Sequence, residues 1–128
     1  MRLRGSVSGL DGLEAALSEI GGGEALKEAF AETAEDIRRR ALANLTDGVP
    51  PDSRTGALAA SLTVTPDADG GCIVGTPLDY GWHLEFGGGA RPPAPWLMPA
   101  AADAGPGLAE RAGARLNDTI AKAVRKPG

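Results

Sequence analysis

Apolar and small side chains recur at every third or fourth position through much of the first half of the chain. The positions are Leu26, Phe30, Thr33, Ala34, Ile37, Ala41 and Leu45. This spacing places them on one face of a helix, with charged residues on the other face. Acidic residues lead the segment and arginines follow, which complements the helix dipole. We therefore expect a long helix near 24–46, ended by Gly48 and the Pro50–Pro51 pair.

Two further segments have the same periodicity. Asp11 precedes Leu13, Ala16, Leu17 and Ile20, and three glycines follow. A capping residue, helical spacing and a glycine stop predict a short helix at 11–20. Near the C-terminus, apolar residues return at every fourth position, namely Leu108, Ala112, Leu116, Ile120 and Val124. They predict a C-terminal helix near 107–125.

Alternation of apolar and polar positions marks candidate strands. Residues 2–7 are compatible with a strand or a tail. Residues 57–66 and 70–77 alternate more clearly, and the Asp-Gly-Gly sequence at 69–71 suits a hairpin turn between them.

The segment 80–86 allows two interpretations. Tyr80, Trp82, Leu84 and Phe86 alternate with Gly81, His83 and Glu85, as in a third strand of the sheet. A helical turn is the competing interpretation. Beyond it, Pro92, Pro93, Pro95 and Pro99 predict an extended, rigid connector within a Pro/Gly-rich arm at about 87–99.

These elements predict an α+β fold, a small antiparallel β-sheet packed with two or three α-helices on one side. The 128 residues fit a single domain spanning 1–128. Hydrophobic residues make up 42% of the chain but aromatic residues only 4%. Because such a core is thin, we expect further burial against other subunits.

Charge and cysteine content narrow the function classes. A net charge of −4 argues against a protein that grips nucleic acid through phosphates, because that affinity comes from clustered Lys and Arg. The single Cys72 excludes an internal disulfide and a thiolate metal site. The sequence has no long apolar run, so we expect a soluble product made in the cytoplasm.

One small group of residues could carry chemistry. On a strand, His83 and Glu85 would project from the same face, with Asp79 four residues before His83, which would suit a metal or acid–base site. The chain has no second histidine, and catalytic metal sites usually need three protein ligands. The glycines at 87–89 lack the Lys and Ser/Thr of a phosphate loop. We therefore favour a structural role for His83 and expect no enzyme, metal or cofactor.

Four segments, taken in order, resemble the tail-component family of long-tailed bacteriophages, which includes neck, tail-completion and minor-tail-like proteins. The segments are Gly9-Leu10-Asp11, Thr55-Gly56-Ala57-Leu58-Ala59-Ala60-Ser61, Tyr80 with Glu85-Phe86-Gly87, and Pro95-Trp96-Leu97-Met98-Pro99-Ala100. The family typically has Gly-Leu-Asp, Thr-Gly-x-Leu-x-x-Ser, Tyr-x-x-x-x-Glu-Phe-Gly and Pro-Phe-Leu-x-Pro-Ala at these places. Trp96 stands where Phe is usual. Each segment is short, and the resemblance depends on their order along nearly the whole chain.

The resemblance implies a virion structural protein, from a phage, a prophage or a gene transfer agent. Such a protein forms a homo-oligomeric ring, expected to be a hexamer, for head–tail joining. Its expected partners are a connector or stopper protein and a tail-terminator or tail-tube protein. DNA would pass through the lumen without specific binding, and no membrane is involved. The protein would be made in the bacterial cytoplasm and act at the virion head–tail junction.

We expect the subunit and ring contacts to come from the arm and from the sheet edges. The candidate residues are Tyr80, Trp82, Glu85, Phe86, Arg91, Pro95, Trp96, Leu97, Met98 and Pro99. A fixed proline backbone lowers the ordering cost of docking, and strand edges at 61–65 or 73–76 could pair with a neighbour. Both tryptophans are equally well explained as core. If the arm is the interface, replacing Trp96 and Leu97 with Ala lowers assembly and leaves the monomer helical.

Three alternatives stay open. The protein could be a tail terminator or another minor tail component. It could be a metal-dependent hydrolase that uses His83, Glu85 and Asp79. A small cytoplasmic adaptor or toxin–antitoxin partner would have the same element pattern.

Overall fold

A computed structural model of the chain describes residues 2–5, 22–47, 53–67, 71–88 and 92–125. The short helix expected at 11–20 and the candidate contact residue Arg91 lie outside these ranges.

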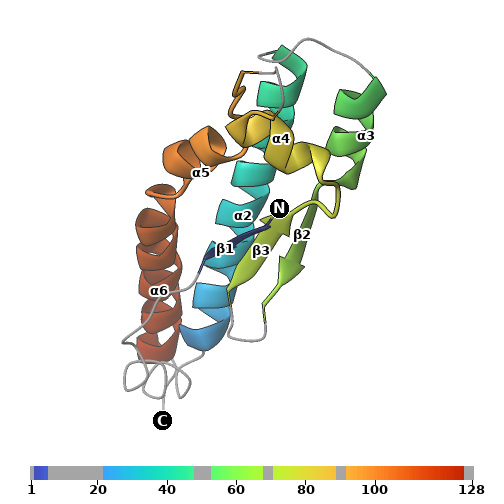
Figure 1. Ribbon diagram of the computed structural model, residues 1–128. Coiled ribbons are helices and arrows are strands. Elements are labelled where there is room, and N and C mark those ends of the chain that lie inside the picture. The colour runs from blue at the N-terminus through green and yellow to red at the C-terminus, as the bar shows by residue number, and fades with distance from the viewer. Residues whose placement is uncertain (1, 6–21, 48–52, 68–70, 89–91, 126–128) are drawn as a thin grey trace.

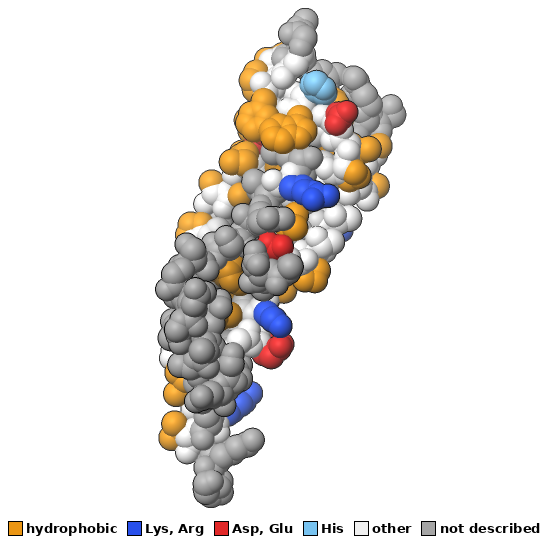
Figure 2. All heavy atoms as spheres, turned by 60° about the horizontal axis from the view of Figure 1, so that its bottom comes forward, with side chains coloured by type: hydrophobic (Ala, Val, Ile, Leu, Met, Phe, Trp, Pro, Cys, Tyr) orange, Lys and Arg blue, Asp and Glu red, His pale blue; other side chains and the backbone are white. Residues whose placement is uncertain are grey.

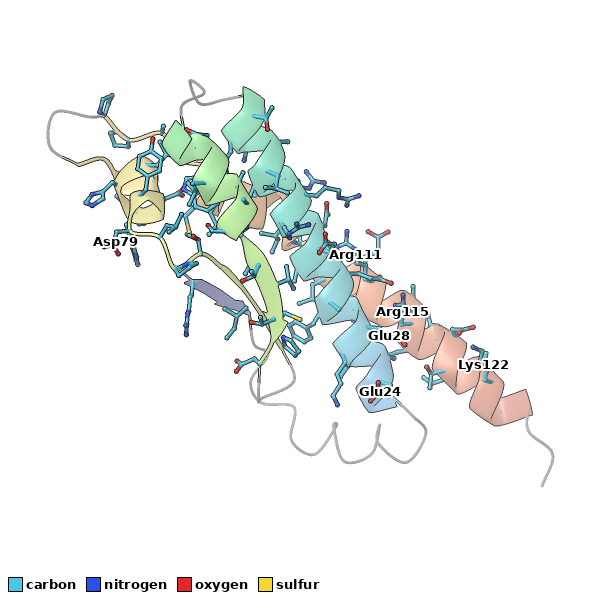
Figure 3. The ribbon with its side chains drawn as sticks, turned by 90° about the vertical axis from the view of Figure 1, so that its right-hand side faces the viewer. Glu24, Glu28, Asp79, Arg111, Arg115 and Lys122 are labelled. Carbon is cyan, nitrogen blue, oxygen red and sulfur yellow. The ribbon has the colours of Figure 1, made fainter. Side chains whose placement is uncertain are left out.

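One long helix, α2 (Gly22–Asp47), runs along most of the molecule, as the periodicity predicts. The β-sheet packs on one flank of α2, and the C-terminal helix α6 (Gly107–Arg125) lies antiparallel on the other (Figures 1 and 3). The helices therefore do not form one layer on one side of the sheet. Instead, α2 lies between the sheet and α6, within an α+β fold.

The sheet has three short antiparallel strands, β1 (Arg2–Gly5), β2 (Thr63–Pro66) and β3 (Cys72–Gly75), in the order β1-β3-β2. Val74 of β3 is opposite Leu3 of β1 and Val64 of β2. Because β3 lies in the centre, both of its backbone edges are used. The expectation that residues 73–76 offer a free edge is therefore wrong, whereas β2 is an edge strand.

Residues 57–61 are helical, contrary to the predicted strand at 57–66. Helix α3 (Ser53–Ser61) precedes β2, which begins only at Thr63. The alanines at 57, 59 and 60 favour a helix. Leu58 and Leu62, four residues apart, are both buried, so tertiary packing rewards the helical spacing.

Residues 80–86 also form a helix, α4 (Tyr80–Phe86), so the strand interpretation is wrong and the competing helical one is confirmed. The buried residues are Gly81, Leu84 and Glu85, a helical spacing of three and four. A strand would instead place Tyr80, Trp82, Leu84 and Phe86 on one face. The predicted connector is shorter than expected, because α5 (Met98–Ala104) includes Pro99 in its first turn. Proline is tolerated there, since an amide in the first turn of a helix has no hydrogen-bond partner within the helix.

The core lies where the second half of α2 meets α3, α4 and α5 (Figure 1). Its largest fully buried side chains are Trp96, Leu45, Leu58, Leu84 and Leu97. Alanines fill much of the remaining space, which fits the low aromatic content. Within the described ranges, no helix is long and apolar enough to span a membrane.

Candidate functional site

The carboxylate of Glu85 fastens α4 to the beginning of α5. Glu85 is only 3% exposed. Its Oε2 accepts hydrogen bonds from the backbone amides of Trp96 and Leu97 at 2.6 and 3.0 Å, and its Oε1 accepts one from Met98 at 2.9 Å. Amides at the beginning of a helix lack intrahelical partners and favour a negative charge. Glu85 therefore caps α5 from a different helix.

Trp96 also contributes to the contact between α4 and the beginning of α5. Its ring is fully buried, and its indole Nε1 donates to the carbonyl oxygen of Gly81 at 3.1 Å. A Cβ atom on Gly81 would lie 2.9 Å from Cγ2 of Thr76 and 3.3 Å from the Trp96 ring. Only glycine fits this position without displacing its neighbours. From α2, Asn44 Nδ2 donates to the Trp96 carbonyl oxygen at 2.9 Å.

Ser61 and Thr76 connect the end of α3 to the segment before α4. Their hydroxyl oxygens are 2.6 Å apart, and Ser61 Oγ donates to the Leu58 carbonyl oxygen at 2.7 Å. The amide of Leu78 donates to Thr76 Oγ1 at 3.1 Å. We call Ser61, Thr76, Gly81, Glu85 and Trp96 the clamp. It brings together three of the four segments on which the phage-family resemblance rests.

An aromatic pair projects from the outer face of α4. Trp82 and Phe86 are 50% and 55% exposed. Their ring centroids are 5.3 Å apart, with an interplanar angle of 31°. We call these two residues the aromatic knob. Figure 2 shows hydrophobic side chains gathered beside the single histidine at this end of the molecule.

The candidate contact residues separate into two groups. Glu85, Trp96 and Leu97 are buried, and Tyr80 is half-buried. The exposed members are Trp82, Phe86, Pro95, Met98 and Pro99. Because both side chains are buried, replacing Trp96 and Leu97 with Ala changes the core, and a loss of assembly in that variant would not identify a surface contact. Trp82 and Phe86 are the positions at which a surface can be tested.

His83 and Glu85 do not converge. Two residues apart on a helix, they point about 200° apart around its axis. His83 is exposed, whereas both carboxylate oxygens of Glu85 accept amide hydrogens. The metal or acid–base site predicted from a strand is therefore not formed by this pair. In the portion of the chain that is described, no three His, Cys, Asp or Glu side chains are grouped as metal ligands.

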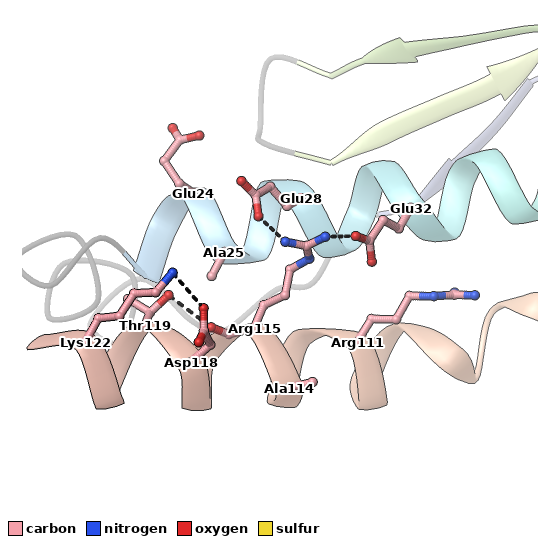
Figure 4. A pocket seen from close by; sticks show the side chains of 10 residues that line it. All are labelled: Glu24, Ala25, Glu28, Glu32, Arg111, Ala114, Arg115, Asp118, Thr119 and Lys122. Atoms are coloured by element: carbon pink, nitrogen blue, oxygen red, sulfur yellow. Dashed lines mark hydrogen bonds and ion pairs between the residues drawn. The ribbon is translucent and has the colours of Figure 1, made fainter.

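A charged groove between α2 and α6 was missed by the sequence analysis. It has a volume of about 640 Å³, and Arg115 of α6 forms ion pairs with Glu28 and Glu32 of α2 (Figure 4). Lys122 pairs with Asp118 at 3.0 Å on the same helix. The charges that line the groove largely neutralise one another. The ion pairs of Arg115 therefore connect α6 to α2 and leave little net charge for a ligand.

Asp36 is the centre of that contact. Its carboxylate accepts from Arg111 of α6 at 2.8 Å, and from Arg39 and Arg40 at 2.9 and 3.1 Å. Hydrogen bonding from Arg111 above all holds the pKa of Asp36 below its ordinary value, against the opposing effect of burial. Arg111 also donates to Thr33 Oγ1 at 3.0 Å. Arg111 thus joins α6 to α2 through hydrogen bonds.

The apolar stripe of α6 is half-buried at Leu108, Ala112 and Leu116 and exposed at its C-terminal end. Ile120 is 45% exposed and Val124 is 78% exposed. The every-fourth spacing correctly predicts the helix, but the polar face of α6, with Arg111 and Arg115, points toward α2 (Figure 3). Charges of opposite sign on 24–32 and 111–122 were the available sequence signal.

A second groove lies at the far end of the sheet from α4. It has a volume of about 460 Å³ and lies between the first half of α2 and the ends of β2 and β3. Its lining residues are Lys27, Glu28, Ala31, Val64, Pro66, Asp67, Gly71 and Cys72. We call it the hairpin groove. Cys72 is half-buried there, and burial raises the pKa of its thiol.

No protein-family model, curated protein sequence or solved structure matches this chain.

Proposed function

We propose that this protein is a ring-forming structural component of a phage-like particle, acting at the head–tail junction. There it joins the connector or stopper to the tail tube, as a neck or tail-completion protein. The observation that carries the proposal is the aromatic knob, held on a helix that the clamp fixes to the core. The family resemblance supplies the biological setting.

Exposed aromatic residues in such a chain need a reason. The chain has two Trp, one Tyr and two Phe, and one Trp and one Phe lie in the knob. Tryptophan is enriched among the residues that dominate binding energy at protein interfaces. The hydrogen bonds of Glu85 and Trp96 fix α4 before any partner arrives, which reduces the ordering cost of association. This arrangement supports a docking role.

The clamp gives the resemblance a physical basis. Ser61, which ends the second segment of the resemblance, contacts Thr76. Glu85 of the third segment caps α5, and Trp96 of the fourth segment contacts Gly81. These side chains link α3, α4 and α5 through hydrogen bonds. They support a structural role for the boxes, with the docking residues between them free to suit a partner.

Acidic net charge supports the passage of DNA. At −4, the chain offers little attraction to phosphates. A ring whose lumen carried such charge would let DNA slide past without holding it. A tail terminator or another minor tail component would share this property, and the partner that binds distinguishes these roles.

The test combines mass and imaging. Light scattering of the purified protein at several concentrations, alone and with portal, stopper and tail-tube proteins of a long-tailed phage, gives the stoichiometry. Negative-stain imaging then shows whether the large species are rings. Rings that bind stopper or tail-tube protein support the proposal. A protein that stays monomeric with every one of these partners contradicts it.

A further inference from the structure

The aromatic knob and the hairpin groove are an unmatched pair of surfaces on one molecule. The knob is an apolar projection on α4, and the groove is a mostly apolar depression near the hairpin end of β2 and β3. Figure 1 shows α4 and this end of the two strands at opposite ends of the sheet. They cannot meet within one chain. Strand β3 alone, from Cys72 to Gly75, separates them by about 10 Å.

We propose that the aromatic knob of one copy docks in the hairpin groove of the next copy. This rests on the proposed ring-forming function and names the contact that closes the ring. Because the knob and the groove are different surfaces, each copy offers one of each. Such a head-to-tail contact repeats until the rotation between copies closes it into a ring.

One pair of opposite charges favours this occupant. Asp79 is exposed at the beginning of α4, beside the knob. Lys27 lies at the groove and, among the described residues, pairs with Glu24 at 3.6 Å, both side chains being well exposed. The lining also includes Asp67 and Glu28, and Glu28 is paired with Arg115 of α6. Docking would bring Asp79 toward Lys27. The knob's rings would contact Ala31, Val64 and Pro66, which are apolar.

The area of the knob fits an anchor within a larger contact. Two aromatic side chains that are half exposed offer about 200 Å² to a partner, against roughly 800 Å² per partner in a standard interface. Edge strand β2, which lines the groove, is adjacent and exposes Thr63 and Thr65. We therefore expect β2 to contribute to the same contact.

Cys72 makes the contact directly testable, because it is the only cysteine and lies in the groove. In the variant Phe86→Cys, mild oxidation should link Cys72 of one copy to position 86 of the next. The expected product is a ladder of dimers, trimers and larger species that reductant removes. Peptide mapping should find the 72–86 bridge. A disulfide requires Cα atoms less than about 7 Å apart, so it reports close docking.

Two matched controls define the result. Ala109→Cys places a second thiol on the exposed surface of α6 and should give no comparable ladder. Adding Cys72→Ser to Phe86→Cys should abolish the ladder. If the double variant still forms dimers, position 86 pairs with itself, and a two-fold contact replaces the proposed one.

A second measurement uses the chain without an added cysteine. At a protein concentration of about ten times the self-dissociation constant, roughly a quarter of the grooves are free, so alkylation of Cys72 by iodoacetamide should be about three- to fourfold slower than in dilute protein. Trp82→Ala should weaken self-association about 30-fold and restore most of the alkylation rate of Cys72.

Oligomers in which Cys72 is not protected from alkylation and the 72–86 bridge does not form would overturn this inference and leave the ring function standing. A protein that remains monomeric overturns the self-docking, and the partner-mixing experiment then decides the ring function separately.

Discussion

At the scale of single residues, the buried carboxylate of Glu85 holds two helices together, and its position in the sequence does not indicate this role. Glu85 satisfies three amides that lie 11 to 13 residues away. Nothing in the local pattern of residues 80–86 identifies this contact, because its partners are backbone groups on another helix. In the sequence, Glu85 stands out as a possible partner of His83 and through the family resemblance, which implies an interface role, whereas the structure buries it.

Replacing Glu85 with Gln should destabilise the protein by roughly 2–4 kcal/mol. The amide keeps the shape, but its nitrogen cannot accept a hydrogen bond, so at least one amide at the beginning of α5 loses its partner. Urea unfolding followed by circular dichroism measures the change. Asp103→Asn makes the same chemical change on the exposed surface of α5 and should have an effect below about 0.5 kcal/mol. Equal effects would contradict the capping role.

Replacing Gly81 with Ala should destabilise the protein by about 1–3 kcal/mol, because the new methyl group overpacks the clamp. The same substitution at Gly113, where a Cβ has no neighbour within 4 Å, should stabilise α6 by up to about 1 kcal/mol. Thermal unfolding of both variants tests the opposite signs. A Gly81→Ala protein as stable as the wild type would show that Thr76 and Trp96 can move aside.

Asp36 predicts an acid-dependent loss of stability. Because its folded pKa is lowered, Asp36 stabilises the fold above about pH 4, the ordinary Asp value, and this contribution is lost as the pH falls toward the folded pKa. Asp36→Asn should cost roughly 2–4 kcal/mol at pH 7. The difference in unfolding free energy between Asp36→Asn and the wild type should shrink as the pH falls from about 5 toward the lowered pKa of Asp36, because the wild-type carboxylate then becomes protonated. A difference that is constant with pH, measured by urea unfolding, would contradict the role of the charge.

At the scale of elements, the long helices of this chain are predictable from the sequence and two of its short helices are not. Long periodic segments predict α2 and α6 well, because one face repeats over several turns. The sequence predicted a strand where α3 forms and left α4 open between a strand and a helical turn, because four or five alternating residues fit both periods. Burial of Leu58, Leu84 and Glu85 decides between them, and it depends on distant contacts.

The contact between α6 and α2 should depend on salt. Arg115, Glu28 and Glu32 are 39%, 56% and 42% exposed, so ions reach these pairs, and the screening length falls to about 3 Å at 1 M salt. Amide hydrogen exchange of α6 should be faster in 1 M than in 0.05 M sodium chloride, two conditions chosen to span that range. Helix α5 is the internal control, since buried Ala100 and Ala104 hold it. In Arg115→Gln, exchange of α6 should be fast at both salt concentrations. Salt-independent exchange of α6 in the wild type would contradict the ion-pair account.

At the scale of the whole molecule, the two tryptophans should separate folding from assembly. Trp96→Ala removes a fully buried ring and should cost about 3–5 kcal/mol of stability. Replacing Trp82 and Phe86 together with Ala should cost less than about 1.5 kcal/mol while abolishing self-association. Thermal unfolding and light scattering on the same samples measure both effects. An assembled double variant would exclude the knob as a contact.

The described hydrophobic core ends at Ala104, and the turn at 105–106 then leads into a helix attached through charged side chains. Because this attachment depends on surface side chains, the C-terminal helix can change independently of the core. A related chain could lengthen, shorten or exchange this helix by altering a few surface charges, with no need to repack the interior. The region after Ala104 is therefore where we expect the chain to accept a fused reporter, and where adaptation to a new neighbour would cost the fold least.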